Sequence, residues 1–454
     1  MQKIINNRYA APLCLITLGL LTRFAFIWHP SEVVFDEVHF GKFINGYLTG
    51  NYYFDIHPPL GKLIVTFGAI IGGFNPEFGF GRISDNYPDY SFIFLRFFPN
   101  LFGALIPAAV YYFVLSIKGS RVCGLLAGLA IVFENAILVQ SHFILLDSIL
   151  LFFGFSGLAL FFFYRQRPEK TYYLISCGLL LSLAISIKWT ALSFFGLVWI
   201  ISYLDLDKIR FNLNKTVKTI TYLFVIPFLV YFLIFTIHFS LLDKSGPGDA
   251  FMTPQFKKTL TGSDSENDIS IKASNNVEKF VELHRTMLAA NQGIKTEHHS
   301  SSKFYLWPLM VKPIYFWYKG SGGDKASRIY VFGNPIVWFT AIGAFILGAI
   351  FWLPDKRETK WLLYSGWILN MLPFMNIKRP LFLYHYFPAL IFSILIMSFF
   401  ITDKIDFTKR SGTLILGGIS LLFLLGFLFF SPLTYGLPLS SESFDLRFWL
   451  KLWR

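Results

Sequence analysis

The chain has 454 residues, of which 54% are hydrophobic and 15% are charged, and its formal net charge is +13. Soluble domains carry about 25% charged residues and rarely repeat apolar runs of roughly 20 residues, so the composition predicts an all-α protein that crosses a membrane many times. Binding of nucleic acid would need a concentrated basic patch. The Lys and Arg residues instead lie in short loops between apolar runs, and we expect no nucleic-acid partner.

Apolar runs long enough to cross a bilayer recur along the whole chain. There are eleven, at residues 11–28, 92–117, 122–140, 143–164, 172–187, 189–204, 218–240, 334–353, 361–377, 381–401 and 412–430. Another apolar stretch, 60–73, would reach only ~21 Å as a helix, which is short of the ~30 Å hydrocarbon core. We therefore expect 60–73 to form an interfacial or re-entrant helix.

Basic residues in the short loops predict the orientation. If the N-terminus lies inside and 60–73 does not cross, every short basic loop falls on the cytoplasmic face, as the positive-inside rule requires. These loops hold Lys3 and Arg8, Lys118 and Arg121, Arg165, Arg167 and Lys170, Lys208, Arg210, Lys215 and Lys218, Lys356, Arg357 and Lys360, and Lys404, Lys409 and Arg410. The prediction is a single multi-pass domain, 1–454, in the cell membrane. Its extracytoplasmic parts are 29–91, 241–333 and the tail 431–454.

The outer segment 241–333 contains an amphipathic stretch at 277–290, which predicts a surface helix. We see no pattern of strands and turns in this segment and expect it to contain no sheet. The cysteines Cys14, Cys123 and Cys177 lie inside apolar runs. They are expected to be small core residues, without a disulfide or metal framework.

Two adjacent carboxylates, Asp36 and Glu37, lie just beyond the first apolar run. Such pairs are often only a solvated loop face. Ionisable groups at a lipid boundary are costly, however, which makes a functional role the working hypothesis.

Further ionisable residues from distant parts of the chain are predicted at the same outer boundary. They are Arg23, Arg96, His142, Asp147, Lys188, His238, Asp243, Lys378, Arg379 and His385. Lys and Arg at helix ends can simply extend their charged heads to water, but cations are normally depleted on this side. Several cations around a carboxylate pair suit an anionic substrate carried by a membrane lipid.

These motifs resemble the protein O-mannosyltransferase family, membrane glycosyltransferases of the GT-C class. The resemblance covers nearly the whole chain. It is carried by residues 35–42 (FDEVHFGK), 53–62 (YFDIHPPLGK), 95–98 (LRFF), 140–148 (QSHFILLDS), 186–189 (SIKW), 245–252 (SGPGDAFM), 333–335 (GNP), 381–386 (LFLYHY) and 436–440 (GLPLS).

The resemblance implies a GT-C fold with eleven membrane helices and transfer of mannose, with inversion, from polyprenyl-phosphate-mannose to Ser or Thr hydroxyls of exported polypeptides. It further implies that Asp36 is the catalytic base and that Glu37 is an acceptor-site or supporting residue. Arg23, Arg96 and His142 match positions in the donor-phosphate environment or its support.

Two departures from the family pattern concern His142, where the family usually has Arg, and Glu134, where it usually has Asp. The segment 241–333 is also too short for the β-trefoil-like MIR repeats of larger eukaryotic members. We therefore expect a prokaryotic-type member. The sequence is compatible with a dimer but does not choose between a dimer and a monomer.

The chemistry requires cations for the phosphate leaving group and a base for the acceptor hydroxyl. One carboxylate base is the inverting arrangement, whereas retention needs a second carboxylate as nucleophile. Because Glu37 is adjacent in sequence and should point elsewhere, Asp36 is the predicted base. We expect Lys188, Arg379 and His385 to contact the donor phosphate. Asp36 and Glu37 could bind a metal with neighbouring histidines, but the pattern is not specific for one, and we expect no cofactor.

Other residues are predicted to support the site or to line its acceptor side. They are His39, Asp55, His57, Asp147, Tyr384 and Asp249. His57 precedes two prolines, which predict a rigid turn before 60–73, and Asp55 is expected to orient it. Tyr384 and His385 fit interfacial anchoring and phosphate contact equally well. Asp249 fits either a tight turn or an acceptor-side wall.

Two other functions are alternatives to this one. The same scaffold could use a lipid or cell-wall glycan as acceptor, or another sugar. A transporter should show inverted repeats and interrupted helices near the bilayer midplane. The sequence shows neither, so glycosyl transfer is the predicted function.

Overall fold

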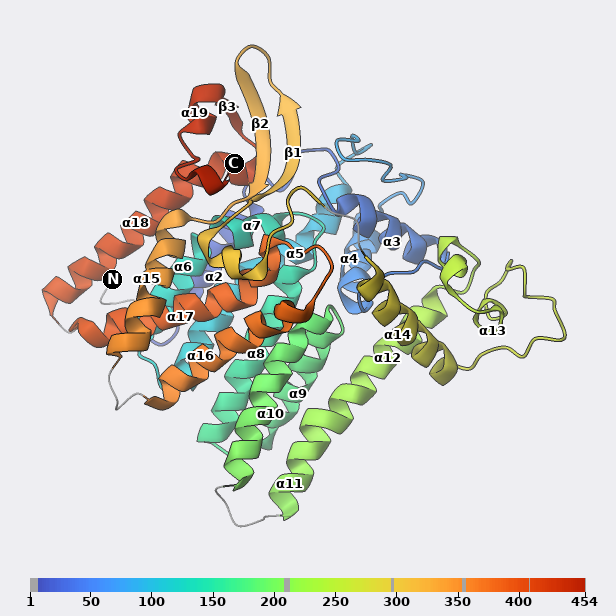
Figure 1. Cartoon of the computed structure of the whole chain (residues 1–454), viewed down its shortest axis with the longest axis horizontal. Helices are drawn as coiled ribbons and strands as arrows, with labels where there is room; N and C mark the ends of the chain where they lie inside the picture. Colours follow the sequence, from blue (N-terminus) through green and yellow to red (C-terminus); the bar gives the residue numbers. More distant parts are fainter. Residues whose placement is uncertain (1–6, 208–212, 295–297, 353–356, 408, 454) are drawn as a thin grey trace.

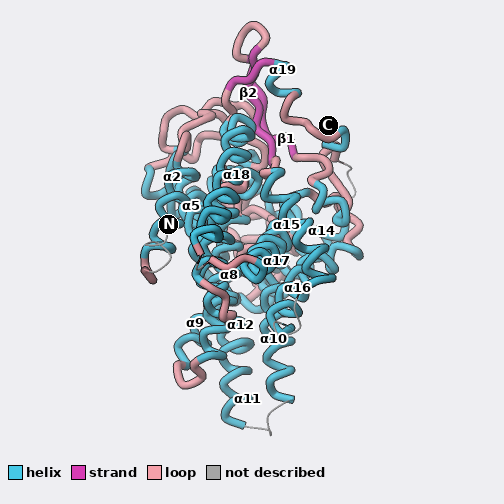
Figure 2. Tube along the Cα trace, turned by 90° about the vertical axis from the view of Figure 1, so that its left-hand side faces the viewer, coloured by secondary structure: helices cyan, strands magenta, loops and turns pink. Residues whose placement is uncertain are grey.

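The computed structural model describes residues 7–207, 213–294, 298–352, 357–407 and 409–453. Helices make up most of these residues, and a small three-stranded sheet stands at one end of the helical body (Figures 1 and 2). The basic-loop residues Lys3, Lys208, Arg210 and Lys356 lie outside the described residues, as does the side chain of Lys215.

Each of the eleven predicted apolar runs contains a helix or a bent pair of helices. They are α2 (Ala10–Phe24), α5 (Phe92–Ser116), α6 (Arg121–Val132) with α7 (Asn135–His142), α8 (Asp147–Gln166), α9 (Thr171–Ile185), α10 (Leu192–Asp207), α12 (Ile226–Leu241), α15 (Pro335–Phe351), α16 (Arg357–Met371), α17 (Phe387–Lys404) and α18 (Arg410–Tyr435). Among the described residues, five helices are long and apolar enough to cross a membrane alone, or six with the bent pair. Eleven crossings therefore stay a prediction.

Between the long helices lie shorter ones. α11 (Leu213–Ile220) continues through a π-helical turn, η2 (Thr221–Val225), into α12. The predicted apolar helix at 60–73 is present as α4 (Leu60–Gly72), which packs against α3 (Glu37–Thr49) and α5. The predicted surface helix is also confirmed, as α14 (Asn276–Gly293). It begins with a capping box in which Asn275 and Glu278 satisfy each other's backbone N–H groups.

The sheet contradicts the expectation that 241–333 contains no strands. β1 (Ile314–Gly320), β2 (Lys325–Val331) and β3 (Pro438–Ser440) form an antiparallel sheet in the order β1–β2–β3. A β-bulge between Tyr315 and Trp317 breaks the alternation of buried and exposed residues, and this alternation is the sequence signal for a strand. The fold is therefore helical apart from this small sheet.

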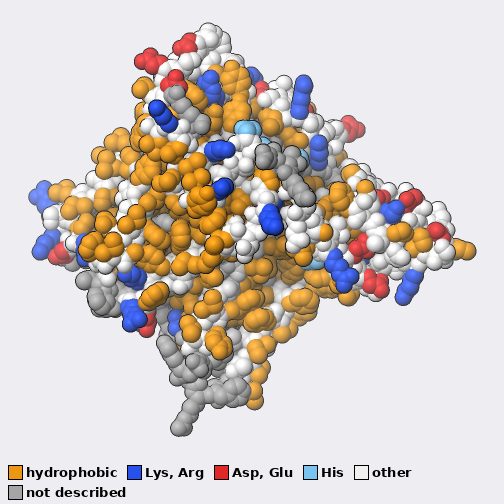
Figure 3. Space-filling model, viewed as in Figure 1, with side chains coloured by type: hydrophobic (Ala, Val, Ile, Leu, Met, Phe, Trp, Pro, Cys, Tyr) orange, Lys and Arg blue, Asp and Glu red, His pale blue; other side chains and the backbone are white. Residues whose placement is uncertain are grey.

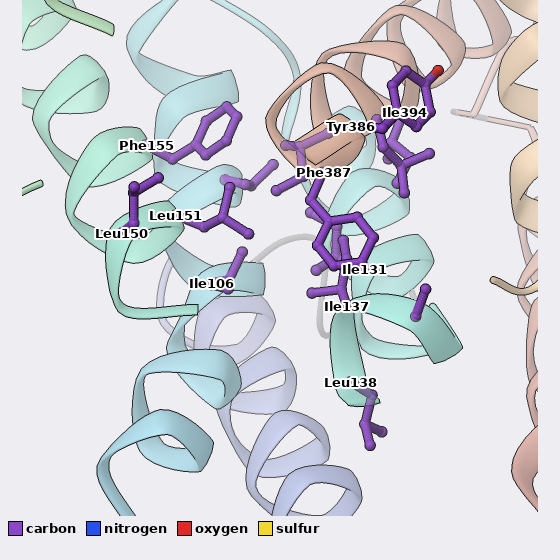
Figure 4. Packing of buried hydrophobic residues seen from close by; sticks show 14 of the residues in the cluster. Ile106, Ile131, Ile137, Leu138, Leu150, Leu151, Phe155, Tyr386, Phe387 and Ile394 are labelled. Atoms are coloured by element: carbon purple, nitrogen blue, oxygen red, sulfur yellow. The ribbon is translucent and has the colours of Figure 1, made fainter. Parts of the chain in front are cut away.

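The core lies where α5, α6, α7, α8 and α17 meet, as the close view of buried side chains shows (Figure 4). Because lipid is as apolar as these side chains, such helices associate through close packing more than through the hydrophobic effect. α2 approaches α5 at Gly19, where an added Cβ would lie 2.4 Å from the carbonyl oxygen of Ala104. A larger residue at this position would push the two helices apart.

Hydrophobic side chains cover much of the visible helical body, whereas charged side chains gather near the hairpin, near α13 (Pro254–Lys257) and at the far end of α18 (Figure 3). α12 and α18 expose large apolar residues such as Phe228, Leu233 and Leu414, each more than half exposed. This surface fits lipid. The protein is a multi-pass membrane protein.

Candidate active site

Asp36 and Glu37 lie at the start of α3, with Asp36 as its N-cap residue. The preceding residue, Phe35, has a φ of +44°, which is uncommon for a residue other than glycine. Its ring stacks on Phe316 of β1 at a centroid distance of 4.1 Å. The two carboxylates have different surroundings, since Glu37 is fully buried and Asp36 is half-buried.

Glu37 is bound by the protein on both oxygens. Arg96 donates from Nε and Nη2 at 2.9 Å each, forming a buried two-pronged ion pair. The N–H of Val34 donates at 2.8 Å, that of Ile144 at 3.1 Å, and the hydroxyl of Tyr87 at 3.1 Å. Through these hydrogen bonds the carboxylate of Glu37 links α3 to α5 and to the loop before α8. This geometry supports a structural role.

Asp36 instead faces other titratable groups. Burial raises the pKa of Asp36 to about 7; Lys188 opposes this shift, whereas the charges of Asp147 and Asp55 add to it. A carboxylate with this pKa is about half ionised at neutral pH, and it can accept a proton there without being a permanently bound anion.

Lys188 lies three residues after the end of α9 and forms an ion pair with Asp147 at the start of α8. Its Nζ is 2.9 Å from each carboxylate oxygen of Asp147. Gln140 donates to the same carboxylate at 2.7 Å. Lys188 Nζ also lies 5.4 Å from the centroid of the Tyr384 ring, within the range of a cation–π contact.

His57 and Arg379 add to this charge distribution. Burial holds the pKa of His57 well below its usual range, and the nearby cations Lys188, Lys62 and Arg379 lower it further. Its imidazole is therefore neutral at pH 7. Burial also lowers the pKa of Arg379.

His385 is held in the short 3-10 helix η7 (Leu383–Tyr386). Its ring stacks on Tyr384 at 4.6 Å and on Trp307 at 5.9 Å.

The structure thus brings together predicted residues from well-separated parts of the chain. We call them the charged cluster: Asp36, His57, Asp147, Lys188, Arg379, Tyr384 and His385.

The other predicted cations are occupied by protein oxygens. Arg23 donates to the carbonyls of Val132 at 2.6 Å and Ile131 at 2.8 Å, at the C-terminal end of α6. The ring nitrogens of His142 lie 3.0 Å from the carbonyl oxygen of Arg23 and 3.2 Å from that of Phe26. Together with the Arg96 pair, these contacts support the scaffold. Their predicted contact with a donor phosphate stays a prediction.

Two predicted supporting residues lie apart from these contacts. His39 is exposed on α3. Asp249 closes a turn, where its carboxylate accepts from the Ser245 hydroxyl at 2.6 Å and from the Gly246 N–H at 3.1 Å. This turn packs closely on the first outer loop, because a Cβ at Gly246 would lie 2.3 Å from the carbonyl oxygen of Tyr52.

Lys62 is a site residue that the sequence analysis missed. It is buried in α4, pairs with Asp55, and donates to the carbonyl of His57 at 2.8 Å. Asp55 therefore binds Lys62, where a contact with His57 was expected. The signal that could have revealed Lys62 is a lysine inside an apolar helix, which needs a partner when it is buried.

No group of three or more His, Cys, Asp or Glu residues is arranged to hold a metal ion among the residues that the structure describes. The expectation of no cofactor stays a prediction, which EDTA treatment can test.

Solved structures define the class of fold. The chain superposes on the protein O-mannosyltransferase Pmt1–Pmt2 complex of S. cerevisiae with a TM-score of 0.89 and 20% identity, covering 98% of this chain and 92% of that one. It superposes on the Archaeoglobus fulgidus oligosaccharyltransferase with a TM-score of 0.57 and 11% identity, covering 96% of this chain and 57% of that one. The fold is that of GT-C membrane glycosyltransferases.

Two family models match in sequence. The model for dolichyl-phosphate-mannose-protein mannosyltransferase covers residues 13–243, and that for the C-terminal four-helix membrane region of protein O-mannosyltransferase covers residues 276–453. The chain belongs to the protein O-mannosyltransferase family, as its motifs predicted.

Relatives with a similar sequence include proteins of yeasts and of a fish. Dolichyl-phosphate-mannose–protein mannosyltransferase 3 of Saccharomyces cerevisiae is 36% identical over 266 residues, and protein O-mannosyl-transferase 2 of Danio rerio is 32% identical over 266 residues. These matches cover 55% and 56% of this chain but only 35% of each relative. A longer match, to mannosyltransferase 1 of Candida albicans, is 23% identical and covers 98% of this chain and 78% of the relative.

Proposed function

We propose that the protein transfers mannose from polyprenyl-phosphate-mannose to Ser or Thr hydroxyls of exported polypeptides, with Asp36 as general base. The observation that carries the proposal is Asp36, a carboxylate with a pKa of about 7, next to the Lys188–Asp147 ion pair. The names of the relatives, which pair dolichyl-phosphate-mannose with protein mannosyl transfer, support this donor and acceptor.

In the proposed reaction the acceptor hydroxyl attacks the anomeric carbon while Asp36 takes the hydroxyl proton. The bond between the anomeric carbon and the phosphate oxygen breaks, and the phosphate leaves with the bonding electrons. Lys188 and Arg379 stabilise this negative charge. Attack from the side opposite the phosphate, with a single carboxylate base, inverts the anomeric configuration. In this proposal Glu37 supports Asp36 through Arg96 and does not touch the sugar.

We also propose where the donor and the acceptor meet relative to the membrane. The donor enters from the bilayer, the charged cluster faces the extracytoplasmic side, and the polypeptide reaches it there. The structural relative with the higher TM-score is a complex of two chains, Pmt1 and Pmt2. A dimer is the corresponding assembly for this chain.

The direct test supplies purified protein with polyprenyl-phosphate-mannose and a Ser/Thr-containing peptide. We expect mannosyl peptide from this mixture and none from a matched peptide with every Ser and Thr replaced by Ala. The anomeric configuration of the product, read by nuclear magnetic resonance, reports inversion or retention. If mannose is transferred only when a lipid or a glycan is added as acceptor, the alternative acceptor is selected. If only a polyprenyl phosphate that carries another sugar supports transfer, the proposed donor is wrong.

The pH dependence of kcat/KM should reflect the titration of the Asp36 carboxylate. Because its pKa is raised to about 7, the base form is lost as the pH falls through 7. We expect kcat/KM to decrease about tenfold for each pH unit below that point. The donor phosphodiester is fully ionised throughout this range and adds no titration of its own. A control His299→Gln variant, changed at an exposed histidine of the outer segment 241–333, should keep the profile. A rate independent of pH between about 5.5 and 8 would contradict a base with a raised pKa at this position.

Replacing Lys188 should weaken donor binding. Lys188→Met removes a cation proposed to bind the phosphate, and a hydrogen bond to a charged group contributes about 1.5–3 kcal/mol. We therefore expect the Kd for the donor to rise roughly 10- to 100-fold, measured by titration with the lipid donor. Lys303→Met, which removes a cation from the outer segment 241–333, should leave the Kd unchanged. An unchanged Kd in Lys188→Met would contradict the role given to this residue.

A further inference from the structure

The hairpin formed by β1 and β2 contacts the loop 32–36, which carries Asp36, at two places, although the two segments lie about 280 residues apart in the sequence. The first contact is at Glu32, and the second is at Phe35, directly before Asp36. In Figure 1 the hairpin rises from the same end of the molecule at which α3 begins. Neither contact was expected, because the sequence analysis predicted no strands here.

The first contact is polar and largely buried. Glu32 is 5% exposed, and its carboxylate accepts a hydrogen bond from the indole Nε1 of Trp317 at 2.8 Å and pairs with Lys319. The carbonyl of Glu32 accepts from Arg96 Nη2 at 3.0 Å. The same guanidinium binds Glu37. One residue of the loop therefore links the hairpin to the ion pair beside Asp36.

The second contact is aromatic. The rings of Phe35 and Phe316 are nearly parallel, with an interplanar angle of 10° at a centroid distance of 4.1 Å. Phe316 also contacts the edge of Phe143, which precedes Ile144, a donor to Glu37. Because Phe35 has a positive φ, its backbone needs contacts that hold it in this conformation. The stack on Phe316 provides one.

Between these two contacts the loop is short. Only three residues lie between Glu32 and Asp36, and the N–H of Val33 donates to the carbonyl of Asp85 at 2.9 Å. Asp36 therefore lies between two residues that are held in place. Phe35 stacks on the hairpin, and Glu37 is bound by Arg96. A displacement of the hairpin would move the residue that carries the reacting carboxylate.

We propose that the β1–β2 hairpin positions the general base, with Glu32 and Trp317 as positioning residues that act through the loop 32–36. The inference depends on the proposed function, because it assigns a purpose to the placement of Asp36. The hairpin tip is exposed from Tyr318 to Lys325, so the hairpin also joins the surface to the reaction centre.

The test uses Trp317→Phe, which removes the indole N–H but keeps an aromatic ring, and Glu32→Gln, which removes the charge. Since a displacement of about 1 Å can cost up to 10²-fold in rate, we expect kcat to fall roughly 5- to 50-fold while KM for donor and peptide changes little. Because burial raises the pKa of Asp36, a base that moves toward water should shift the acidic limb of the rate profile to lower pH. The double variant should be no slower than the slower single variant, since both changes weaken the same contact between Glu32 and the hairpin.

A matched control is Trp453→Phe. Trp453 is 2% exposed and donates from its indole to the carbonyl of Leu309 at 3.1 Å, so the change removes a similar hydrogen bond away from the loop. The control should keep kcat and the rate profile. Unchanged kcat in Trp317→Phe, or a change in KM alone, would overturn the proposal.

A second measurement does not need activity. Hydrogen exchange of the peptide covering 31–40 should become faster in Trp317→Phe and stay unchanged in Trp453→Phe. If the wild type transfers no mannose, the proposed function fails, while this exchange result still decides whether the hairpin holds the loop. Equal exchange in the wild type and Trp317→Phe would reject the contact as a positioning device. If Trp317→Phe does not fold, Lys319→Met and Glu32→Gln provide the same comparison.

Discussion

Asp36→Asn should abolish mannosyl transfer while leaving donor binding intact. The amide cannot take a proton from the acceptor hydroxyl, and general base catalysis contributes about 10²–10⁴-fold to rate. We therefore expect kcat to fall by at least about 10²-fold. The donor Kd should stay within a factor of about two, because Lys188 and Arg379 are unchanged. Single-turnover transfer to peptide and titration with the lipid donor measure the two quantities separately.

The matched control for this variant is Asp89→Asn. Asp89 lies in the same outer segment, and its exposed carboxylate accepts from the backbone N–H of Ser91 at 2.7 Å. Its replacement should leave transfer unchanged. Normal turnover by Asp36→Asn would remove Asp36 as the base, and loss of donor binding together with turnover would place it among the binding residues.

Glu37→Gln should act mainly on stability. The Glu37–Arg96 pair is fully buried on both sides, and removal of one partner of a buried ion pair costs about 3–5 kcal/mol because the other charge is left uncompensated. We expect a clear decrease in the thermal unfolding midpoint of the detergent-purified protein. Activity should fall at least in proportion to the folded fraction, because Glu37 also helps to hold the neighbouring Asp36 in place.

The comparison for Glu37→Gln is Asp264→Asn, which breaks an exposed ion pair with Lys257. Surface pairs of this kind contribute about 0–1 kcal/mol, so its midpoint should stay near that of the wild type. If Glu37→Gln keeps the wild-type midpoint but loses turnover, Glu37 takes part in the chemistry and the supporting role assigned to it is wrong.

The helices could be predicted because a membrane span leaves a long apolar run, and the family could be recognised because its motifs lie at the ends of those runs. Side-chain directions could not be predicted. Arg23 and Lys188 are both cations near predicted outer helix ends, yet Arg23 binds carbonyls inside the scaffold and Lys188 belongs to the charged cluster. The number of membrane crossings before a helix end predicts the face on which that end lies. Packing decides which way a side chain at that end points.

The features that the sequence analysis missed depend on contacts between distant segments. The hairpin was overlooked because its bulge and its aromatic residues mask the strand period. The 60° bend between α6 and α7 was also missed, because residues 122–140 are continuously apolar apart from Glu134, Asn135 and the last residue, Gln140. Buried polar partners such as Lys62 with Asp55 can be suspected from sequence, but the pairing itself appears only in the fold.

The bend between α6 and α7 has a consequence for the order of assembly. Its free backbone groups are satisfied from both directions along the chain: Arg23 donates to the last carbonyls of α6, and the side-chain amide of Asn334 donates to the carbonyl of Phe133 at 2.9 Å. Unsatisfied backbone groups are costly in lipid. During synthesis this bend therefore stays incomplete until Asn334, some 200 residues later, has been inserted. The middle of the protein should reach its final form only after the second half of the chain is made.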